Sequence, residues 1–465
     1  MNTPADIWID VTTLVNWRRP AVGILRVEQQ LCRWLTETRP DALRFCRYER
    51  ATGQFFELDR EIVAAHLRRI DAYASQDVAQ RPASVAGRLK PLLRGLLIRL
   101  GRVSPGLAQA LVNARPRLLG WLGASRRLAA RLRPRPCGVP APHAGTPVQL
   151  AAGSVYVSLG LDWDYKDMAQ LYRLRQANGF RTLFFCYDII PVRFPQLCVA
   201  DVSRQFAHYF ADLAWAADLV LCISESTRRD LRSFLERVGV PCPATDVIHL
   251  GGEIQSGAET QGAVSAAIAR LAGEPYILFV STIERRKNHE ILYRAYTRLV
   301  EEGIALPRLV FVGMSGWGVQ DLLSDIALDP RVQGLIVQLN HVSDAELAVL
   351  YRHARFTVYP SLYEGWGLPV AESLAFGKFC LCANTSSLPE VGGDWVEYLD
   401  PWDLPAWVER LRHYLTHPEE VDAHNARIAA GYRAHPWSET AAAIFSHAQR
   451  LRASASPALP EENPS

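Results

Sequence analysis

Two series of short apolar segments constrain the fold of this chain more than any other feature of its sequence. Each segment has the length of a strand and is nearly free of polar residues, as in strands that are covered on both faces. Amphipathic stretches of helical length separate the segments. We therefore predict an α/β fold with two Rossmann-like, doubly wound domains. The segments are 7–11, 155–159, 182–187, 219–224 and 246–250 in the first series, and 276–280, 308–312, 335–338, 356–359 and 379–382 in the second.

The two series also predict the domain boundaries. A chain of 465 residues is long enough for two domains. The last residues are rich in Ser, Pro and Glu, a composition typical of a disordered tail. The predicted parts are a first domain over 1–252 with a basic helical insertion at about 78–147, a linker over 253–275, a second domain over 276–435, a crossover helix over 436–452 that returns to the first domain, and a tail over 453–465.

Composition favours a globular cytoplasmic protein. No run of about 18 apolar residues is present, and the N-terminus lacks the features of a signal peptide. The nine cysteines show no spacing typical of disulfide frameworks or metal sites, and most lie in apolar segments. We expect them to be reduced core residues.

The segment 361–377, with the sequence SLYEGWGLPVAESLAFG, follows one of the predicted strands directly. Gly365 and Gly367 allow a tight turn and a close approach to a ligand. Pro369 suits the first position of a helix, and Gly377 suits its end. A strand, a glycine turn and a helix N-terminus together aim unpaired N–H groups at one spot, which favours an anion such as phosphate.

Two carboxylates, Glu364 and Glu372, flank this spot and could face one crevice. The whole segment resembles the E-x7-E signature of retaining glycosyltransferases of family 4, which have the GT-B fold. The resemblance implies that Glu364 contacts the donor sugar and that Glu372 contacts the ribose hydroxyls. It also implies that backbone amides hold the donor diphosphate, at Gly365, Trp366, Gly367 and Leu368.

A second informative segment, 281–288 (STIERRKN), is basic and follows the first strand of the second domain. Turns after parallel strands are where ligands bind, and Arg and Lys both suit phosphate. The segment resembles the family's G-T-x-E-P-R-K-N, which implies that Arg286 and Lys287 neutralise the diphosphate. It departs from the family at Ser281, where glycine is common, and at Arg285, where proline is common.

Two further turns resemble parts of the family's nucleotide pocket. Gly313 resembles the glycine of a V-G turn, and Val342 lies where backbone groups hold the base. Because backbone contacts leave little trace in side chains, the base cannot be read from this sequence. Ser343 or Asp344 is expected to cap the helix that follows.

In the first domain, Tyr187 and Asp188 begin a segment that resembles the family's H-D-L-I-P, with tyrosine in place of histidine. Asp188 is retained, and it either lies near the reacting sugar or only caps the next turn. Gly23 and Arg26 resemble the family's G-I-x-R loop near the donor phosphate or the acceptor. The S-x-x-T turn at 224–227 is expected to cap a helix.

The Asp162-Trp163-Asp164 segment is a D-x-D after a strand, the metal-binding pattern of a different glycosyltransferase fold. The surrounding order fits GT-B instead, so we predict no metal and favour acceptor binding or helix capping.

A basic window from 78 to 161 contains no Asp or Glu, although the net charge of the whole chain is only +3. Its apolar, leucine-rich stretches with interspersed arginines fit either an anionic membrane surface or an ordinary helical subdomain with a solvated basic face. Nucleic acid fits less well because stacking aromatic residues are nearly absent.

Together these motifs predict an enzyme that moves a hexosyl group, of mannosyl type, from a nucleotide diphosphate sugar to a glycan or lipid-linked acceptor with retention. The overall pattern resembles bacterial mannosyltransferases of O-antigen and exopolysaccharide assembly, which favours GDP-mannose as the donor substrate and requires no cofactor. Catalytic roles are expected for Glu364, Asp188 and Lys287. The alternatives are a catalytically silent GT-B assembly partner and a nucleotide-sugar epimerase.

Overall fold

The computed structural model describes residues 6–18, 23–39, 43–76, 145–198, 200–254 and 264–454. Most of the predicted basic insertion lies outside these described residues, as does the predicted tail beyond 454. Only 145–147, at the end of the predicted insertion, are described, and Thr146 and Pro147 already belong to strand β4 (Thr146–Val148).

The first lobe contains an eight-stranded sheet with the order β4-β3-β2-β1-β5-β6-β7-β8. Strands β2, β1, β5, β6, β7 and β8 run parallel, whereas β3 pairs antiparallel with β2 and with β4. The strands are β1 (Ile7–Asp10), β2 (Leu43–Glu49), β3 (Gln54–Leu58), β4 (Thr146–Val148), β5 (Val155–Ser158), β6 (Arg181–Cys186), β7 (Leu219–Cys222) and β8 (Ala244–Val247).

Alternate side chains along these strands enter two separate cores, because successive residues of a strand point to opposite faces. On one face Ile7, Ile9 and Val157 pack with α2 (Ile24–Thr38), α3 (Arg60–Gln76) and the C-terminal helix α19 (Trp437–Ala453). On the other face Trp8 and Tyr156 pack with α7, α9 and α10. The helices of this lobe are α1 (Thr12–Asn16), α2 (Ile24–Thr38), α3 (Arg60–Gln76), α6 (Asp162–Tyr165), α7 (Met168–Asn178), α8 (Ile190–Arg193), the 3₁₀-helix η1 (Pro195–Leu197), α9 (Ala200–Ala216) and α10 (Glu225–Val238).

The second lobe contains a six-stranded sheet with the order β11-β10-β9-β12-β13-β14, and all of its strands are parallel. Its register places Ile277 of β9 between Leu309 of β10 and Phe356 of β12. The strands are β9 (Tyr276–Val280), β10 (Arg308–Val312), β11 (Ile336–Leu339), β12 (Phe356–Tyr359), β13 (Cys380–Ala383) and β14 (Glu397–Leu399).

Helices cover both faces of this sheet as well. Phe279 and Phe311 face the core formed with α12 and α17, whereas Leu278 and Val310 face the core formed with α11 and α14. The helices are α11 (Ala266–Ala272), η2 (Arg285–Lys287), α12 (His289–Glu301), α13 (Gln320–Leu328), α14 (Asp344–His353), α15 (Leu368–Ala375), α16 (Leu388–Gly392), η3 (Gly393–Trp395), α17 (Leu404–Thr416), α18 (Pro418–Gly431) and α19 (Trp437–Ala453).

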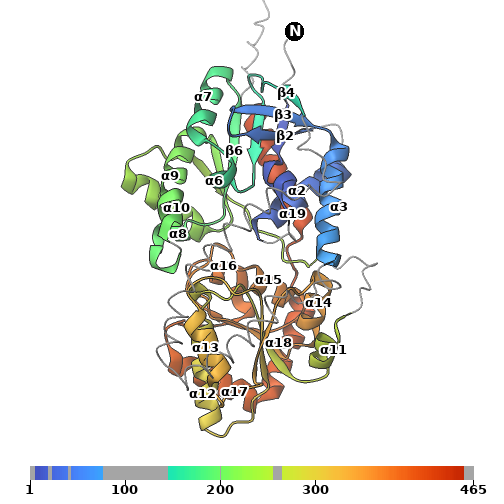
Figure 1. Ribbon diagram of the computed structural model, residues 1–465, viewed down its shortest axis with the longest axis vertical. Coiled ribbons are helices and arrows are strands. Elements are labelled where there is room, and N and C mark those ends of the chain that lie inside the picture. The colour runs from blue at the N-terminus through green and yellow to red at the C-terminus, as the bar shows by residue number, and fades with distance from the viewer. Residues whose placement is uncertain are drawn as a thin grey trace, which may run out of the picture. The chain divides into compact units, whose positions relative to one another are not determined.

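Helix α19 returns to the first lobe, as expected for the crossover helix. In Figure 1 this red helix lies among the blue N-terminal elements, and it contacts α2, β1, β5 and β6. Trp437 at its start is buried against Gly251, where a Cβ atom would lie 2.5 Å from the indole ring. Only glycine therefore allows the chain to approach this tryptophan.

The structure confirms two doubly wound domains but corrects several details. Strand β8 ends at Val247 rather than Leu250, because this edge strand is only partly buried and its apolar pattern is weak. The predicted linker over 253–275 contains α11, which buries Ile268 and Leu271. Helix α15 begins at Leu368, so Pro369 takes its second position. None of the helices in the described part of the chain is long and apolar enough to span a membrane.

Candidate active site

The second sheet reverses its winding direction between β9 and β12. The chain passes from β9 outward to β10 and β11, and then returns to β12 on the other side of β9. The loops that leave two such neighbouring strands diverge, and they leave a crevice where ligands bind in open α/β sheets. In this lobe the two loops are 281–288 and 360–367, the two segments singled out in the sequence.

These two loops meet through a cluster of charged side chains, Arg286, Lys287 and Glu364. The Nζ atom of Lys287 lies 2.5 Å from Oε1 of Glu364, and Nη1 of Arg286 lies 2.6 Å from Oε2. Arg286 also contacts Glu284 at 2.8 Å. Lys287 and Glu364 are buried, and Arg286 is mostly so. The predicted cationic pair and the first predicted carboxylate therefore form one group.

The pKa shifts in this cluster show how strongly its charges act on one another. Burial alone would raise the pKa of Glu364, but Arg286 and Lys287 outweigh burial and hold it at about 2. Burial and the neighbouring Arg286 lower the pKa of Lys287, although Glu364 acts in the opposite direction. Because the charged form of Lys287 is disfavoured, an incoming phosphate would stabilise it.

The backbone around Glu364 is fixed by two serines that the sequence analysis did not identify. Ser386 Oγ accepts a hydrogen bond from the N–H of Glu364 at 2.8 Å. Ser387 Oγ lies 3.0 Å from the carbonyl of Glu364 and 2.6 Å from that of Trp366. The sequence held a signal for these serines. They belong to the polar segment that follows β13, and β13 lies beside β12 in a parallel sheet, so the loops after both strands leave the same edge.

The glycine turn leaves backbone donors available beside this cluster. Among the hydrogen bonds of the described residues, none uses the N–H groups of Gly365, Trp366, Gly367 or Leu368. These groups precede and open α15, where the partial positive charge of the helix dipole is largest. Gly367 has φ +128°, a conformation that glycine adopts readily. The arrangement can hold an anion, as predicted.

Asp188 of the first lobe lies next to this turn. A Cβ atom on Gly365 would lie 2.1 Å from the carbonyl oxygen of Tyr187 and 3.0 Å from Cβ of Asp188. Burial raises the pKa of Asp188, while Arg286 opposes that shift. Asp188 Oδ1 also accepts from the N–H of Ile190, so the capping role holds together with its place beside the cluster.

The S-x-x-T turn does more than cap a helix. Ser224 accepts from the N–H of Thr227 and caps α10, as expected. Its hydroxyl also lies 2.8 Å from the carbonyl of Gly365, and the Thr227 hydroxyl lies 3.3 Å from the same oxygen. The first lobe thereby holds the glycine turn of the second.

Glu372 has a different set of partners from Glu364. Its Oε1 lies 3.3 Å from Nη1 of Arg26, and its Oε2 accepts from the Tyr351 hydroxyl at 2.9 Å. Nη2 of Arg26 also donates to both oxygens of Asp344, at 2.9 and 3.0 Å. Ser343, rather than Asp344, caps α14. The G-I-x-R segment of the first lobe thus reaches the second predicted carboxylate.

Other predicted residues lie away from this charged cluster. The hydroxyl of Tyr187 donates to the carbonyl of Leu159 at 2.6 Å, so it belongs to the core of the first lobe. Gly313 is required because a Cβ atom there would lie 2.0 Å from the carbonyl of Ser281. Val342 packs at the edge of the α11–α14 core. Gly23 has φ +49°, and none of the described atoms lies within 4 Å of where its Cβ would be.

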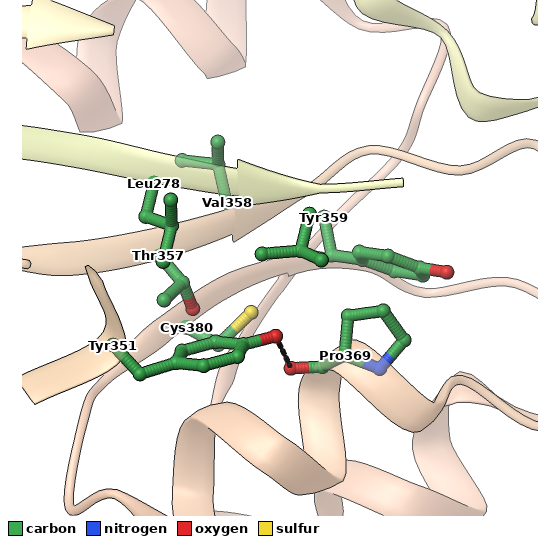
Figure 2. A pocket seen from close by; sticks show the side chains of 8 residues that line it. Leu278, Tyr351, Thr357, Val358, Tyr359, Pro369 and Cys380 are labelled. Atoms are coloured by element: carbon green, nitrogen blue, oxygen red, sulfur yellow. Dashed lines mark hydrogen bonds between the residues drawn. The ribbon is translucent and has the colours of Figure 1, made fainter. Parts of the chain in front are cut away.

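A small gap beneath the start of α15 is shown in Figure 2. Side chains of β9, β12 and β13 line it together with Tyr351 and Pro369, and the Tyr351 hydroxyl points toward the Pro369 carbonyl at 3.3 Å. The gap has no room for a water molecule. It is a packing gap below the candidate site, not the ligand site itself.

The two carboxylates of the D-x-D segment do not act together. Asp162 is buried and lies 2.8 Å from Nζ of Lys166, whereas Asp164 is exposed. Within the described ranges no group of three or more His, Cys, Asp or Glu side chains is placed to hold a metal ion.

Comparison with known proteins adds a family match for part of the chain. Residues 264–432 match the family model described as "Glycosyl transferases group 1". This range covers both loops of the candidate site and excludes the first lobe.

Two curated relatives from Escherichia coli align with part of the chain. Serotype-specific mannosyltransferase WbdA is 30% identical over 214 residues, which cover 44% of this chain and 26% of the relative. O-antigen chain mannosyltransferase B is 35% identical over 174 residues, which cover 37% of this chain and 41% of the relative. The aligned part therefore spans well under half the length of either relative.

One solved structure supports the fold over nearly the whole chain. The Anabaena protein Alr3699/HepE, solved with UDP and glucose, aligns with a TM-score of 0.52 at 12% sequence identity. The alignment covers 97% of this chain and 100% of that protein. At this identity the likeness concerns the fold alone, and it agrees with the two doubly wound lobes described above.

Proposed function

We propose that this protein is a retaining glycosyltransferase that moves a hexosyl group, of mannosyl type, from a nucleotide diphosphate sugar to a glycan or lipid-linked acceptor. The observation that carries the proposal is the cluster of Arg286, Lys287 and Glu364 at the switch point of the second sheet. Free backbone amides lie next to this cluster. Together they form a site suited to a diphosphate that carries a sugar.

The chemistry follows from where charge develops. Departure of a nucleoside diphosphate leaves positive charge on the sugar ring and adds negative charge to the leaving group. Lys287, Arg286 and the amides at Gly365–Leu368 would stabilise the leaving group, because preorganised donors act strongly in a partly buried site. Glu364, ionised at neutral pH, would orient the sugar and favour its positive charge. Asp188, which belongs to the first lobe, would lie near the reacting sugar.

The comparisons with known proteins support a mannosyl-type group as the one transferred. The part of the chain that holds the cluster matches a family described as glycosyl transferases, and two partial relatives are named as mannosyltransferases, one of them for the O-antigen chain. We therefore propose a role in the synthesis of a surface polysaccharide, with GDP-mannose as the first donor to test.

Turnover that depends on both donor and acceptor tests this proposal. Purified protein would be incubated with GDP-mannose or UDP-glucose, with and without an oligomannoside acceptor, and nucleoside diphosphate release would be measured. We expect release that requires the acceptor, and an anomeric configuration in the product, read by NMR, that matches the donor. Inversion would contradict retention.

The two alternatives give different results in the same assay. An epimerase would convert the nucleotide sugar without any acceptor. A catalytically silent assembly partner would bind a nucleotide sugar but release no nucleoside diphosphate under any of these conditions.

We also propose peripheral association with an anionic membrane, supported only by the acid-free basic window of the sequence. The full chain should cosediment with vesicles that contain an anionic phospholipid and not with neutral phosphatidylcholine vesicles. Equal recovery with both kinds of vesicle would contradict this part of the proposal.

A further inference from the structure

Arg26 of the first lobe contacts Glu372, the carboxylate that the resemblance to the family assigns to the ribose of the nucleotide. We propose that Arg26 competes with the ribose of the nucleotide for Glu372, so that nucleotide binding displaces a contact between the two lobes. This inference rests on the proposed function, because it takes the ligand to be a nucleoside diphosphate.

Both oxygens of Glu372 are engaged by protein groups. Arg26 contacts Oε1, and Tyr351, which belongs to the core of the second lobe, contacts Oε2. Glu372 is 5% exposed, so few directions of approach remain. The two vicinal hydroxyls of a ribose would need the lone pairs of the same carboxylate. The Tyr351 contact lies within one lobe and can persist, whereas the Arg26 contact would have to give way.

The geometry makes the contact between Arg26 and Glu372 the weaker part of the arrangement. Nη2 of Arg26 lies 2.9 and 3.0 Å from the two oxygens of Asp344, whereas Nη1 reaches Oε1 of Glu372 only at 3.3 Å. Hydrogen bonds between charged groups are strongest when they are short, at about 2.7–2.9 Å. Arg26 can therefore leave Glu372 and remain paired with Asp344, which is 42% exposed on its side chain.

Arg26 lies in the first turn of α2 between Leu25 and Val27, which are both buried in the first core. The backbone of this turn is therefore held by packing, and the guanidinium would leave Glu372 by rotation of the Arg26 side chain between its staggered rotamers.

In the protein without ligand, the contact between Arg26 and Glu372 affects the charge of this carboxylate. Burial raises the pKa of Glu372, and Arg26 opposes that shift. Arg26 thus favours the ionised form of this carboxylate in the protein without ligand. Because the contact joins the two lobes, a ligand that displaces it weakens one of their ties, and by reciprocity the tie weakens ligand binding.

Calorimetric titration of the full chain and its Arg26→Ala variant with GDP and UDP tests the inference. The nucleotide that binds is then compared with its 2′,3′-dideoxy form, which lacks the ribose hydroxyls. We expect Arg26→Ala to bind the ordinary nucleotide about 10-fold more tightly, near the low end of typical coupling between sites. The dideoxy form should show no such gain.

Two further variants keep the test decisive. Arg33 lies on the same helix as Arg26 but pairs with Asp71 within the first lobe. Arg33→Ala should therefore leave the nucleotide affinity unchanged. Arg26→Gln replaces Arg26→Ala if the alanine variant does not fold, as judged by circular dichroism, and it should also bind more tightly.

The outcomes separate the inference from the function on which it rests. Equal or weaker binding by the Arg26 variants, or an equal gain for the dideoxy nucleotide, overturns the competition while the proposed function stands. Wild-type protein that binds both forms equally overturns the ribose contact of Glu372, and the competition with it. Wild-type protein that binds no nucleoside diphosphate overturns the proposed function itself.

Discussion

The two sheets share a topological feature but place opposite chemistry on it. The first sheet reverses its winding between β1 and β5, as the second does between β9 and β12. At the first switch point Lys166 lies 3.1 Å from Asp10 and 2.8 Å from Asp162, all three being buried. Glu28 is buried close by, and Gly160 packs tightly against Thr13.

The first switch point thus has three carboxyl groups around one lysine and little space. Glu28 accepts from the N–H of Leu14 through Oε1, while its Oε2 has no hydrogen-bond partner among the described residues. The second switch point places two cations, Arg286 and Lys287, among the carboxyl groups of Glu364, Glu284 and Asp188. It also adds the backbone amides at 365–368, which have no partner among the described residues. The comparison shows that position in the sheet does not decide what a crevice binds. The second cation and the unused amide donors distinguish the second crevice from the first.

The largest expected effect is at the first switch point. Lys166→Met would leave Asp10 and Asp162 buried without their cation, and breaking a buried pair in this way costs about 3–5 kcal/mol. We expect that loss in the free energy of unfolding from urea denaturation. Lys378→Met, a change at a half-buried lysine, is the matched control and should cost under about 1 kcal/mol. Equal losses in the two variants would show that the first cluster is not structural.

At the second switch point the same substitution should affect transfer more than stability. Lys287→Met removes one donor to the leaving group, and such losses lower the rate by about 10²–10³-fold. Glu364 keeps Arg286, Ser361 and Tyr359 as partners, so the fold should survive. Acceptor-dependent nucleoside diphosphate release measures the rate. Arg285→Ala removes an exposed neighbouring cation and should leave the rate within about twofold. Full activity of Lys287→Met would remove Lys287 from the mechanism.

A smaller effect is expected where the first lobe touches the glycine turn. A Cβ atom on Gly365 would lie 2.1 Å from the Tyr187 carbonyl, so Gly365→Ala must displace the turn that carries Glu364. A displacement of about 1 Å can lower activity by about 10²-fold. Gly273→Ala, where the added atom meets only an ordinary contact at 3.5 Å, is the control and should be close to neutral. Wild-type kinetics in Gly365→Ala would contradict the close approach.

The smallest expected effect is a change in the pH dependence of stability. Burial and the nearby Asp10 raise the pKa of Glu28 well above its ordinary value. A carboxyl group whose pKa is raised by folding loses stability as the pH rises through its folded pKa. The side chain introduced by Glu28→Gln cannot ionise, so the free energy of unfolding should fall less than in the wild type as the pH rises above the ordinary glutamate pKa of about 4.3. Parallel profiles for the two proteins would contradict a neutral Glu28.

Much of the fold could be predicted because the central strands carry their own signal. The predicted strands 276–280, 308–312 and 356–359 coincide with β9, β10 and β12, which are apolar throughout and covered on both faces. Edge strands were harder to predict. β8 alternates between exposed and partly buried residues, and the three-residue β14 was missed, because an edge strand needs few apolar residues.

The composition of the charged cluster could be predicted, but its connections could not. Arg286, Lys287 and Glu364 stand at the ends of recognisable strands, and a parallel sheet brings those ends together. The contacts of Arg26 with Glu372 and of Ser224 with Gly365 join residues more than 100 positions apart. No local periodicity encodes such pairs, because they join loops that are far apart in the sequence.

The central claim is that the second switch point grips a diphosphate. The most direct measurement is the difference in affinity between a nucleoside diphosphate and its parent nucleoside, determined by calorimetry for the wild type and for Lys287→Met. The account predicts that the wild type prefers the diphosphate strongly and that the substitution removes most of this preference. An undiminished preference for the diphosphate in Lys287→Met would contradict the account.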